Sequence, residues 1–538
     1  MDMLNEDWLP HISPEVASEV KGNYLDAYLI ALEGWRRGLT LKWHIKDAEA
    51  FKDMKTWFVD HPGQLFTLES PEKKHYFFRT RGDKVTNDAV EKAMDKTVTK
   101  QIMVEKSISV PKGMQFTKNT KIEKVIQFAN DIGYPVVVKP VDGSFGRGVF
   151  TEIKDRSELT HILQYVQNEA KEQSFIIEQH VYGKDYRLYV VDGQVVGAIL
   201  RLPANVIGDG INTLESLIEI KNNERLLNPR LMDCLIKIDN DLIRFVEKQG
   251  YTLDQVIEKD HLVHLSDKAN ISIGGDPIGV LNSLDEKVKQ VAVQALQAVE
   301  GLPHGAVDIM YDEVKQEPYV IELNPTSQLG GILFPLEGKS SDIPAAIIDY
   351  YFPETIGVVT DKHKMYFDFF EVIEPLVSRQ SIVTTVTPAL LGTIHMRKYN
   401  VFGEVTNLGY HLGLRKQAFE RNLHGFVNII NENEIEIIVA GLEKEMVDDF
   451  ENGITEDEER AVVLEISKTD YNGYVKVGFD PRANIKVLEQ DLNEMVEELD
   501  DVRTSIRQLE VKKRKLLQST SWKVTKPIRT VGAIFKKK

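Results

Sequence analysis

The chain has 538 residues, of which 42% are hydrophobic and 28% are charged, and its formal net charge is −17. That length exceeds an ordinary single domain and predicts three or four folded units, while the composition is typical of soluble globular proteins. The negative charge argues against nucleic acid as a partner, and a single cysteine, Cys234, excludes an intramolecular disulfide and a cysteine-rich metal site. Because the first residues are acidic and no later stretch approaches the ~18 apolar residues that cross a bilayer, we expect a cytoplasmic protein.

Residues 1–95 predict a small α/β unit. An amphipathic run from Tyr24 to Gly38 predicts a helix, and short segments at 39–44 and 75–79 predict strands. No candidate site can be identified in this unit from its residues alone.

Residues 96–355 carry the clearest functional signals, with Val-rich strand patterns separated by helices and Gly-rich turns. Lys139 ends one such strand and is followed by a loop containing Gly143, Gly146 and Gly148. Glycines let backbone N–H groups approach phosphate oxygens, and the ammonium group adds positive charge. A Gly-rich loop alone is weak evidence, since ordinary tight turns share it and no Gly-Lys-Ser/Thr motif follows.

Oxygen-bearing side chains on two later strands predict a metal site. Asp308 lies in an apolar strand, and Glu322 and Asn324 lie two apart on another, so they face the same side. Hard oxygen donors suit Mg²⁺ bound together with a triphosphate. Ordinary surface carboxylates are a poor alternative, because an unpaired charge in an apolar strand is costly.

With these motifs, residues 100–351 resemble the ATP-grasp domain of cyanophycin synthetases and bifunctional glutathione synthetases. The resemblance is carried by VVKPVDGSFGRG at 137–148, RLPANVIGDGINT at 201–213, ANISIGG at 269–275 and IELNP at 321–325. It implies that two lysines and a glycine-rich loop bind the phosphates of ATP, and that further residues border the adenine and ribose. These nucleotide-binding residues are Lys100, Lys139, Gly143, Ser144, Gly146, Gly148, Glu178, Val181 and Asp185.

The same resemblance implies the groups around the reacting atoms. Arg187 and Arg201 match catalytic positions beside the transferred phosphate, and Asn270 and Ser272 resemble a substrate-binding loop on the acceptor side. The implied ligands of Mg²⁺ or Mn²⁺ are Asp308, Glu322 and Asn324. The implied reaction is attack of a carboxylate on the γ-phosphate of ATP, followed by attack of an amine on the acyl phosphate.

Residues 391–480 predict a separate module, joined to the preceding domain by a connector at 356–390. A helix is expected over 412–422 and strands over 425–430 and 435–440. The sequence from Val401 to Asn428 resembles an acylphosphatase, which implies a ferredoxin-like α+β fold.

Two functional positions of the acylphosphatase family are changed in this module. The family uses a loop arginine to hold the acyl phosphate and an asparagine to orient water, but the matching residues here are His411 and Ile429. Asn428 lies one residue away and points to the opposite face of its strand. We therefore expect an impaired or inactive module. The alternatives are binding of an acyl phosphate without hydrolysis and a degenerate scaffold or partner surface.

The last segments, 484–518 and 519–538, predict a coiled coil and a basic amphipathic tail. Apolar residues of the first recur at spacings of three and four, at Ile485, Leu488, Leu492, Met495, Leu499, Val502, Ile506 and Leu509. Self-association into a homo-oligomer is favoured over packing within the chain. The tail resembles a short element of bacterial glycosyltransferases that build envelope polysaccharides and predicts peripheral contact with the inner face of the cell membrane, the alternative being an unstructured basic tail.

The sequence thus predicts a multidomain α/β and α+β protein. The domains are 1–95 (pre-ATP-grasp), 96–355 (ATP-grasp), 356–390 (connector), 391–480 (acylphosphatase-like), 484–518 (coiled coil) and 519–538 (tail). The predicted function is ATP-dependent ligation of a small-molecule carboxylate to an amine, such as addition of an amino acid to a small acid or an envelope polymer precursor. The alternatives are a non-catalytic ATP-binding scaffold and an acylphosphatase.

Overall fold

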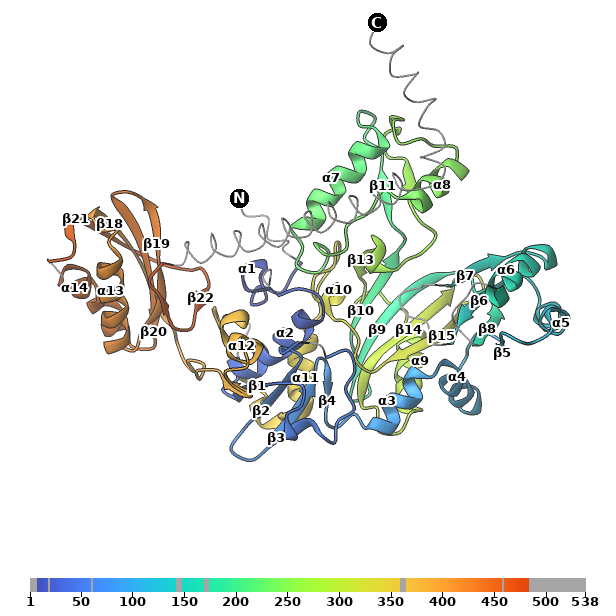
Figure 1. Ribbon diagram of the computed structural model, residues 1–538, viewed down its shortest axis with the longest axis horizontal. Coiled ribbons are helices and arrows are strands. Elements are labelled where there is room, and N and C mark those ends of the chain that lie inside the picture. The colour runs from blue at the N-terminus through green and yellow to red at the C-terminus, as the bar shows by residue number, and fades with distance from the viewer. Residues whose placement is uncertain are drawn as a thin grey trace, which may run out of the picture. The chain divides into compact units, whose positions relative to one another are not determined.

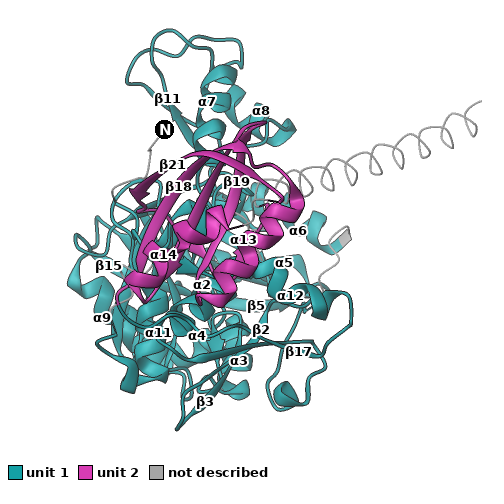
Figure 2. Ribbon diagram, turned by 90° about the vertical axis from the view of Figure 1, so that its left-hand side faces the viewer, with its two compact units in different colours: residues 1–392 teal, residues 393–538 magenta. Residues whose placement is uncertain are grey.

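The computed structural model describes residues 7–17, 20–59, 61–141, 148–168, 174–358, 364–456 and 459–482. The chain divides into two units, Met1–Gly392 and Thr393–Lys538, which Figure 2 colours separately. The predicted coiled coil and tail lie outside the described residues. Within these ranges, no helix is both long enough and apolar enough to cross a membrane.

The first unit begins with a five-stranded antiparallel sheet in the order β17-β1-β2-β3-β4, of which β1 to β4 are labelled in Figure 1. Its strands are β1 (Thr40–His44), β2 (Leu65–Glu69), β3 (Lys74–Phe78), β4 (Arg81–Gly82) and β17 (Val383–Thr385). Helix α2 (Asn23–Arg36) packs on β1 and β2 and is buried along most of its length. The N-terminal helix and strands expected from the sequence are therefore present.

Residues 356–390, predicted as a connector, add structure to this N-terminal sheet instead. Strand β17 pairs with β1, and helix α12 (Phe369–Val377) packs against β17 and β1. The ring of Phe369 lies 5.3 Å from that of Trp43, and the indole N–H of Trp35 donates to the carbonyl oxygen of Thr387 at 2.7 Å. A three-residue strand has too weak a pattern to be predicted, because only its pairing with β1 makes it a strand.

The central domain contains two antiparallel sheets. The smaller, in the order β5-β8-β6-β7, consists of β5 (Gly113–Thr117), β8 (Ser174–Gln179), β6 (Val136–Pro140) and β7 (Phe150–Ile153), with helices α5 (Ile122–Ile132) and α6 (Arg156–Asn168). The larger, in the order β13-β10-β9-β14-β15, consists of β13 (Asp276–Gly279), β10 (Gln194–Leu202), β9 (Lys184–Val191), β14 (His304–Asp312) and β15 (Glu317–Asn324). Helix α9 (Glu286–Gln297) covers one face of the larger sheet and buries an apolar core against it. The opposite face is partly covered by α10 (Gly330–Leu333) and α11 (Ile343–Tyr351), which contact β10 and β9.

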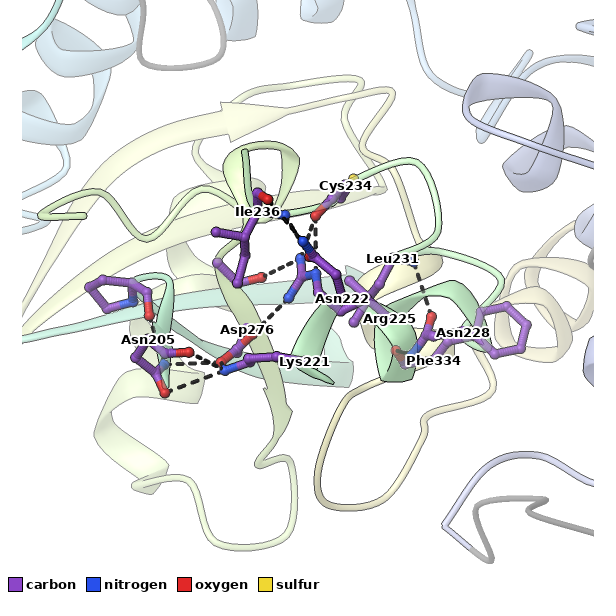
Figure 3. A network of polar contacts seen from close by, with 12 residues as sticks. Asn205, Lys221, Asn222, Arg225, Asn228, Leu231, Cys234, Ile236, Asp276 and Phe334 are labelled. Atoms are coloured by element: carbon purple, nitrogen blue, oxygen red, sulfur yellow. Dashed lines mark hydrogen bonds and ion pairs between the residues drawn. The ribbon is translucent and has the colours of Figure 1, made fainter. Parts of the chain in front are cut away.

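Residues 204–275 form an extension of this domain with its own small core. Its elements are β11 (Asn205–Ile207), α7 (Leu214–Leu226), α8 (Asn240–Lys248) and β12 (Leu262–His264). The buried carboxylate of Asp276 on β13 fastens the extension to the sheet (Figure 3). It accepts hydrogen bonds from Arg225 Nη1 at 2.8 Å and Asn205 Nδ2 at 3.0 Å, and it pairs with Lys221. The remaining Arg225 donors reach the carbonyl oxygen of Cys234, so this network is closed.

The second unit has the chain order β-α-β-β-α-β and the sheet order β21-β18-β20-β19, the ferredoxin-like topology expected from the sequence. Its elements are β18 (His395–Glu404), α13 (Leu408–Glu420), β19 (His424–Asn431), β20 (Glu434–Gly441), α14 (Lys444–Thr455) and β21 (Val462–Asp470), with β23 (Phe479–Asp480) parallel to β19. Helix α13 begins earlier than predicted, because the Asn407 side chain caps it by accepting from the Gly409 N–H at 2.7 Å.

We predict that Arg225→Met strongly destabilises the first unit. The substitution leaves Asp276 with fewer partners in a buried site, and breaking a buried ion pair costs about 3–5 kcal/mol. Urea unfolding monitored by tryptophan fluorescence measures the change. The matched control is Arg244→Met on the exposed side of α8, expected to shift the free energy of unfolding by less than about 0.5 kcal/mol. Equal stability of the two variants would contradict a fastening role for Arg225.

Candidate active site

The face of the larger sheet opposite α9 carries a row of charged side chains. Tyr186, Leu188 and Val190 of β9 belong to the core beneath α9, so Asp185 and Arg187 point to the other face. Cross-strand pairing then places residues of three neighbouring strands in line. The aligned residues are Arg187 on β9, Asp308 on β14 and Glu322 on β15, with Asn324 two residues further along.

Asp308 is the centre of this row and is held by two arginines. Arg187 forms a two-pronged contact, with Nε 2.7 Å from Oδ1 and Nη2 2.8 Å from Oδ2, and Arg201 Nη1 lies 3.2 Å from Oδ2. Burial alone would raise the pKa of Asp308, but the two guanidinium groups lower it to about 2. The carboxylate is therefore charged at any physiological pH.

Asp185 contributes a second carboxylate beside Arg201. Its Oδ1 lies 3.1 Å from Arg201 Nε, and burial raises its pKa although Arg201 opposes this shift. Burial would lower the pKa of Arg201, but the carboxylates of Asp308 and Asp185 raise it. Here Asp185 contacts an arginine, while its predicted contact with ribose stays a prediction.

Two lysines share one buried carboxylate in the smaller sheet. Lys100, on helix α4 (Lys96–Glu105), lies 2.7 Å from Glu178 Oε2 on β8, and Lys139 on β6 pairs with Oε1. Burial would raise the pKa of Glu178, but both ammonium groups lower it. Burial and Lys139 lower the pKa of Lys100, although Glu178 opposes them. Two cations on one anion leave a net positive charge, which is suited to phosphate oxygens.

The remaining predicted nucleotide residues are only partly described. Gly143, Ser144 and Gly146 lie outside the described residues, whereas Gly148 has a φ of 68°, a left-handed conformation that favours glycine. Val181 is buried next to the end of β8. Glu178 meets the two lysines here, and its predicted place beside the adenine stays a prediction.

The predicted acceptor-side residues lie on a short helical turn, η2 (Ile271–Ile273). Asn270 precedes the turn and is half-buried, while Ser272 is exposed. The turn packs against α10 (Gly330–Leu333), because a Cβ added to Gly331 would lie only 2.7 Å from the Cδ1 of Ile271. It therefore approaches the segment that directly follows β15.

The chemistry of Asp308, Glu322 and Asn324 fits a divalent cation. Asp308 and Glu322 stand opposite each other on adjacent strands, and Asn324 Nδ2 donates to Glu322 Oε1 at 3.0 Å, which leaves the amide oxygen as an acceptor. In the described ranges, no three His, Cys, Asp or Glu side chains are grouped so that they could hold a metal ion. A metal site here consequently needs the amide oxygen as well as the two carboxylates.

A polar cluster that the sequence did not predict lies where α2 meets the segment after β15. We call it the Asp26 cluster, and it consists of Asp26, Arg79, Arg230 and Gln328. Asp26 Oδ1 accepts from the backbone N–H of Leu329 at 2.8 Å, and Arg230 Nη2 donates to Gln328 Oε1 at 2.9 Å. The signal available in the sequence was a single acidic residue, Asp26, within the apolar run Leu25–Leu32.

The changed positions of the second unit are occupied by structural contacts. His411 is fully buried, its Nε2 lies 2.7 Å from the carbonyl oxygen of Val405, and its Nδ1 accepts from Arg482 Nε at 3.2 Å. Burial lowers the pKa of His411, which keeps the imidazole neutral. Asn428 donates to Glu436 at 3.2 Å. Both ring nitrogens of His411 are thus hydrogen-bonded within the second unit, and the imidazole does not replace a phosphate-binding arginine.

Comparison with known proteins finds family matches for two parts of the chain. Residues 93–208 match the family model of the RimK-like ATP-grasp domain, and residues 397–481 match that of acylphosphatase. A cyanophycin synthetase of Crocosphaera subtropica is 30% identical over 273 residues, which cover 49% of this chain and 31% of that protein. A glutathione biosynthesis bifunctional protein of Desulfotalea psychrophila is 29% identical over 309 residues, which cover 56% of this chain and 39% of that protein.

Among solved structures, a bifunctional glutathione synthetase from Pasteurella multocida is 26% identical, with a TM-score of 0.44, over 54% of this chain and 41% of that one. The matched parts span between about a third and two fifths of the two curated relatives. The predicted resemblances to ATP-grasp ligases and to acylphosphatases are both confirmed.

We predict that the chain does not hydrolyse benzoyl phosphate above the uncatalysed rate. The reason is that His411 is neutral and fully engaged, and Ile429 offers no hydrogen bond to orient water. Release of benzoate followed by ultraviolet absorbance measures the reaction. Hydrolysis that survives Lys139→Ala but disappears in His411→Ala would show that the second unit is an active acylphosphatase.

Asp26 is expected to lower stability at neutral pH. Burial raises its pKa from 3.8 to about 6, although Arg79 and the Leu329 N–H lower it. Because the folded state binds this proton more tightly than the unfolded state, stability falls as pH rises from about 4 to about 6 and then levels off. Asp26→Asn removes this dependence and should raise the free energy of unfolding by about 3 kcal/mol above pH 6.

Urea unfolding of wild type and Asp26→Asn at about pH 4 and about pH 7.5 checks this expectation. The advantage of the variant should be present at the higher pH and absent at the lower. The same difference at both values would mean that Asp26 titrates normally.

Proposed function

Since the chain contains an ATP-grasp domain, we propose that it is an ATP-dependent ligase that joins a carboxylate to an amine and releases ADP and phosphate. The observation that carries the proposal is the row formed by Arg187, Asp308 and Glu322, with Arg201 beside it. Such a row combines fixed positive charge with hard oxygen donors, as transfer of a phosphoryl group requires.

The lysine pair is the proposed phosphate-binding site. Lys100 and Lys139 are anchored by Glu178, so their ammonium groups are held in place before a nucleotide arrives. Their net positive charge supports binding of the ATP phosphates, and the glycines after β6 would let backbone N–H groups approach the same oxygens.

In the proposed first step, a carboxylate oxygen of the substrate attacks the γ-phosphorus of ATP. The bond from this phosphorus to the bridging oxygen breaks, and ADP leaves with that electron pair. Arg187 and Arg201 offset the negative charge of the transferred group. A divalent ion held by Asp308, Glu322 and Asn324 would supply further charge neutralisation.

In the second step, the amine nitrogen attacks the acyl carbon. The carbon–oxygen bond to phosphate breaks, phosphate leaves with that electron pair, and the nitrogen gives up one proton, which the departing phosphate can accept, as the amide forms. The arginines hold the departing phosphate, which supports the forward reaction.

The proposed substrates are a small acid or envelope polymer precursor and an amino acid. The relatives named cyanophycin synthetase and glutathione biosynthesis protein support an amino acid as one substrate. Membrane contact and homo-oligomerisation are proposals that rest on residues outside the described ranges.

The test uses purified protein with MgATP, pools of amino acids and candidate acids labelled with ¹⁸O in the carboxylate. We expect ADP release that depends on an acid and an amine, and transfer of one ¹⁸O atom to phosphate, because the carboxylate oxygen attacks phosphorus. If the protein binds MgATP but no pool of amino acids and acids causes ADP release, the ligase proposal is overturned.

The variant that tests the row is Glu322→Gln, which keeps the size of the side chain but removes its charge. Loss of the Glu322 charge from the proposed metal site is expected to lower kcat by roughly 100- to 1,000-fold, the size of effect that removing one electrostatic stabiliser of a transition state has. If the chain is instead a non-catalytic scaffold, its assembly with partners should follow ATP binding. Neither the wild type nor Glu322→Gln should then form any product.

A further inference from the structure

We propose that the Asp26 cluster is the binding site for a zwitterionic α-amino acid, whose carboxylate lies at Arg79 and Arg230 and whose ammonium group lies at Asp26. The inference rests on the proposed ligase function and names the acceptor substrate of that site. It is carried by charged atoms that are buried but lack hydrogen-bond partners.

Three atoms of the cluster have no partner among the described residues. They are Asp26 Oδ2, Arg79 Nε and Arg230 Nε. Asp26 is 1% exposed and Arg230 is 8% exposed, so solvent does not satisfy these atoms freely. The nearest charge to Asp26 Oδ2 is Arg79 Nη2, and their 3.9 Å separation is too long for a hydrogen bond.

Leaving a buried charged group unpaired costs more than leaving a neutral one, so native proteins seldom do so without a functional reason. The unpaired atoms comprise one anionic acceptor and two cationic donors. A ligand that fills all three needs an ammonium group beside a carboxylate. An α-amino acid has this arrangement, with the two groups on one carbon.

The other atoms of the cluster are already fixed by the fold. Asp26 Oδ1 accepts from the Leu329 N–H, and Arg230 donates to Gln328 Oε1 and to the Cys234 sulfur, each at 2.9 Å. A Cβ added to Gly330 would lie 2.4 Å from the Cδ of Arg230, so only glycine leaves room for this arginine. The fold therefore holds these atoms of the cluster in place by its own contacts.

Arg79 is held in an unusual backbone conformation. Its φ is 55°, in the left-handed region that is uncommon for residues other than glycine, and its N–H donates to the carbonyl oxygen of Gln64 at 2.9 Å. Such strain is typical of positions whose side chain must point in one direction. The Arg79 side chain is 11% exposed, so it is the more accessible member of the Asp26–Arg79 pair.

The cluster lies on the catalytic face of the larger sheet. Leu329 and Gly330 closely follow Asn324, the last residue of β15. Tyr189 lies two residues after Arg187 on the same face of β9, and burial together with the nearby Asp26 carboxylate raises the pKa of its hydroxyl. An amino acid at Asp26 would therefore present its amine toward the side of the sheet where the acyl phosphate is proposed to form.

The test measures binding of each of the twenty protein amino acids to the full chain by calorimetry, with and without MgATP, next to ligase turnover. For the amino acid that binds, the matching amine without a carboxylate and the matching acid without an amine are also titrated. We expect the complete amino acid to bind at least about 10-fold more tightly than either fragment.

The variants are Arg79→Met and Asp26→Asn, with Arg244→Met as the matched control. Each cluster variant should raise the Kd and KM for the amino acid by about 10- to 100-fold, while the Kd for MgATP stays unchanged. Arg244→Met should behave like wild type. Asp26→Asn is expected to fold, because it removes a buried charge.

Three outcomes would overturn the inference. They are absence of any amino acid binding, fragments that bind as well as the whole amino acid, and cluster variants with unchanged amino acid affinity. Failure of the ligase proposal is distinct, because it shows as absent ADP release in the wild type whatever the binding experiment finds.

Discussion

The ion pair between Asp308 and Arg187 is the contact on which the arrangement of the site depends. It joins two adjacent strands at one register position and directs both side chains away from the core beneath α9. A slip of one residue in either strand would send its charged side chain into that core. The pair therefore fixes the register of the sheet and the position of the proposed chemistry at once.

The same charge pattern recurs in four places of the first unit. The carboxylates of Glu178, Asp308, Asp26 and Asp276 are each buried and each lie near two cationic side chains. At Asp276 the surrounding donors and acceptors satisfy one another, which makes that network a structural fastening. At Glu178 the two lysines leave a net positive charge, and at Asp26 one carboxylate oxygen lacks a partner among the described residues, whereas Asp308 shares Arg201 with Asp185.

The sequence predicts the parts of the site that are local in the chain. Alternation along one strand places Glu322 and Asn324 on one side, and the apolar strand before Lys139 marks a buried position. The Asp26 cluster is different, because its members come from segments far apart in sequence that meet only when α2 packs against the segment after β15. Neighbourhoods of this kind have no periodicity to detect, and the edge strand β17 was missed for the same reason.

The pairing of β17 with β1 has a consequence for how the chain is made. Residues 40–44 leave the ribosome long before residues 383–385, on the order of 20–70 s at usual rates of synthesis. During that interval one edge of β1 lacks its neighbour, and the rings of Tyr28 and Trp43 lack the cover of Phe369. The N-terminal sheet is therefore completed after the central domain has emerged, and until then one edge of β1 exposes backbone N–H and C=O groups that can pair with another chain.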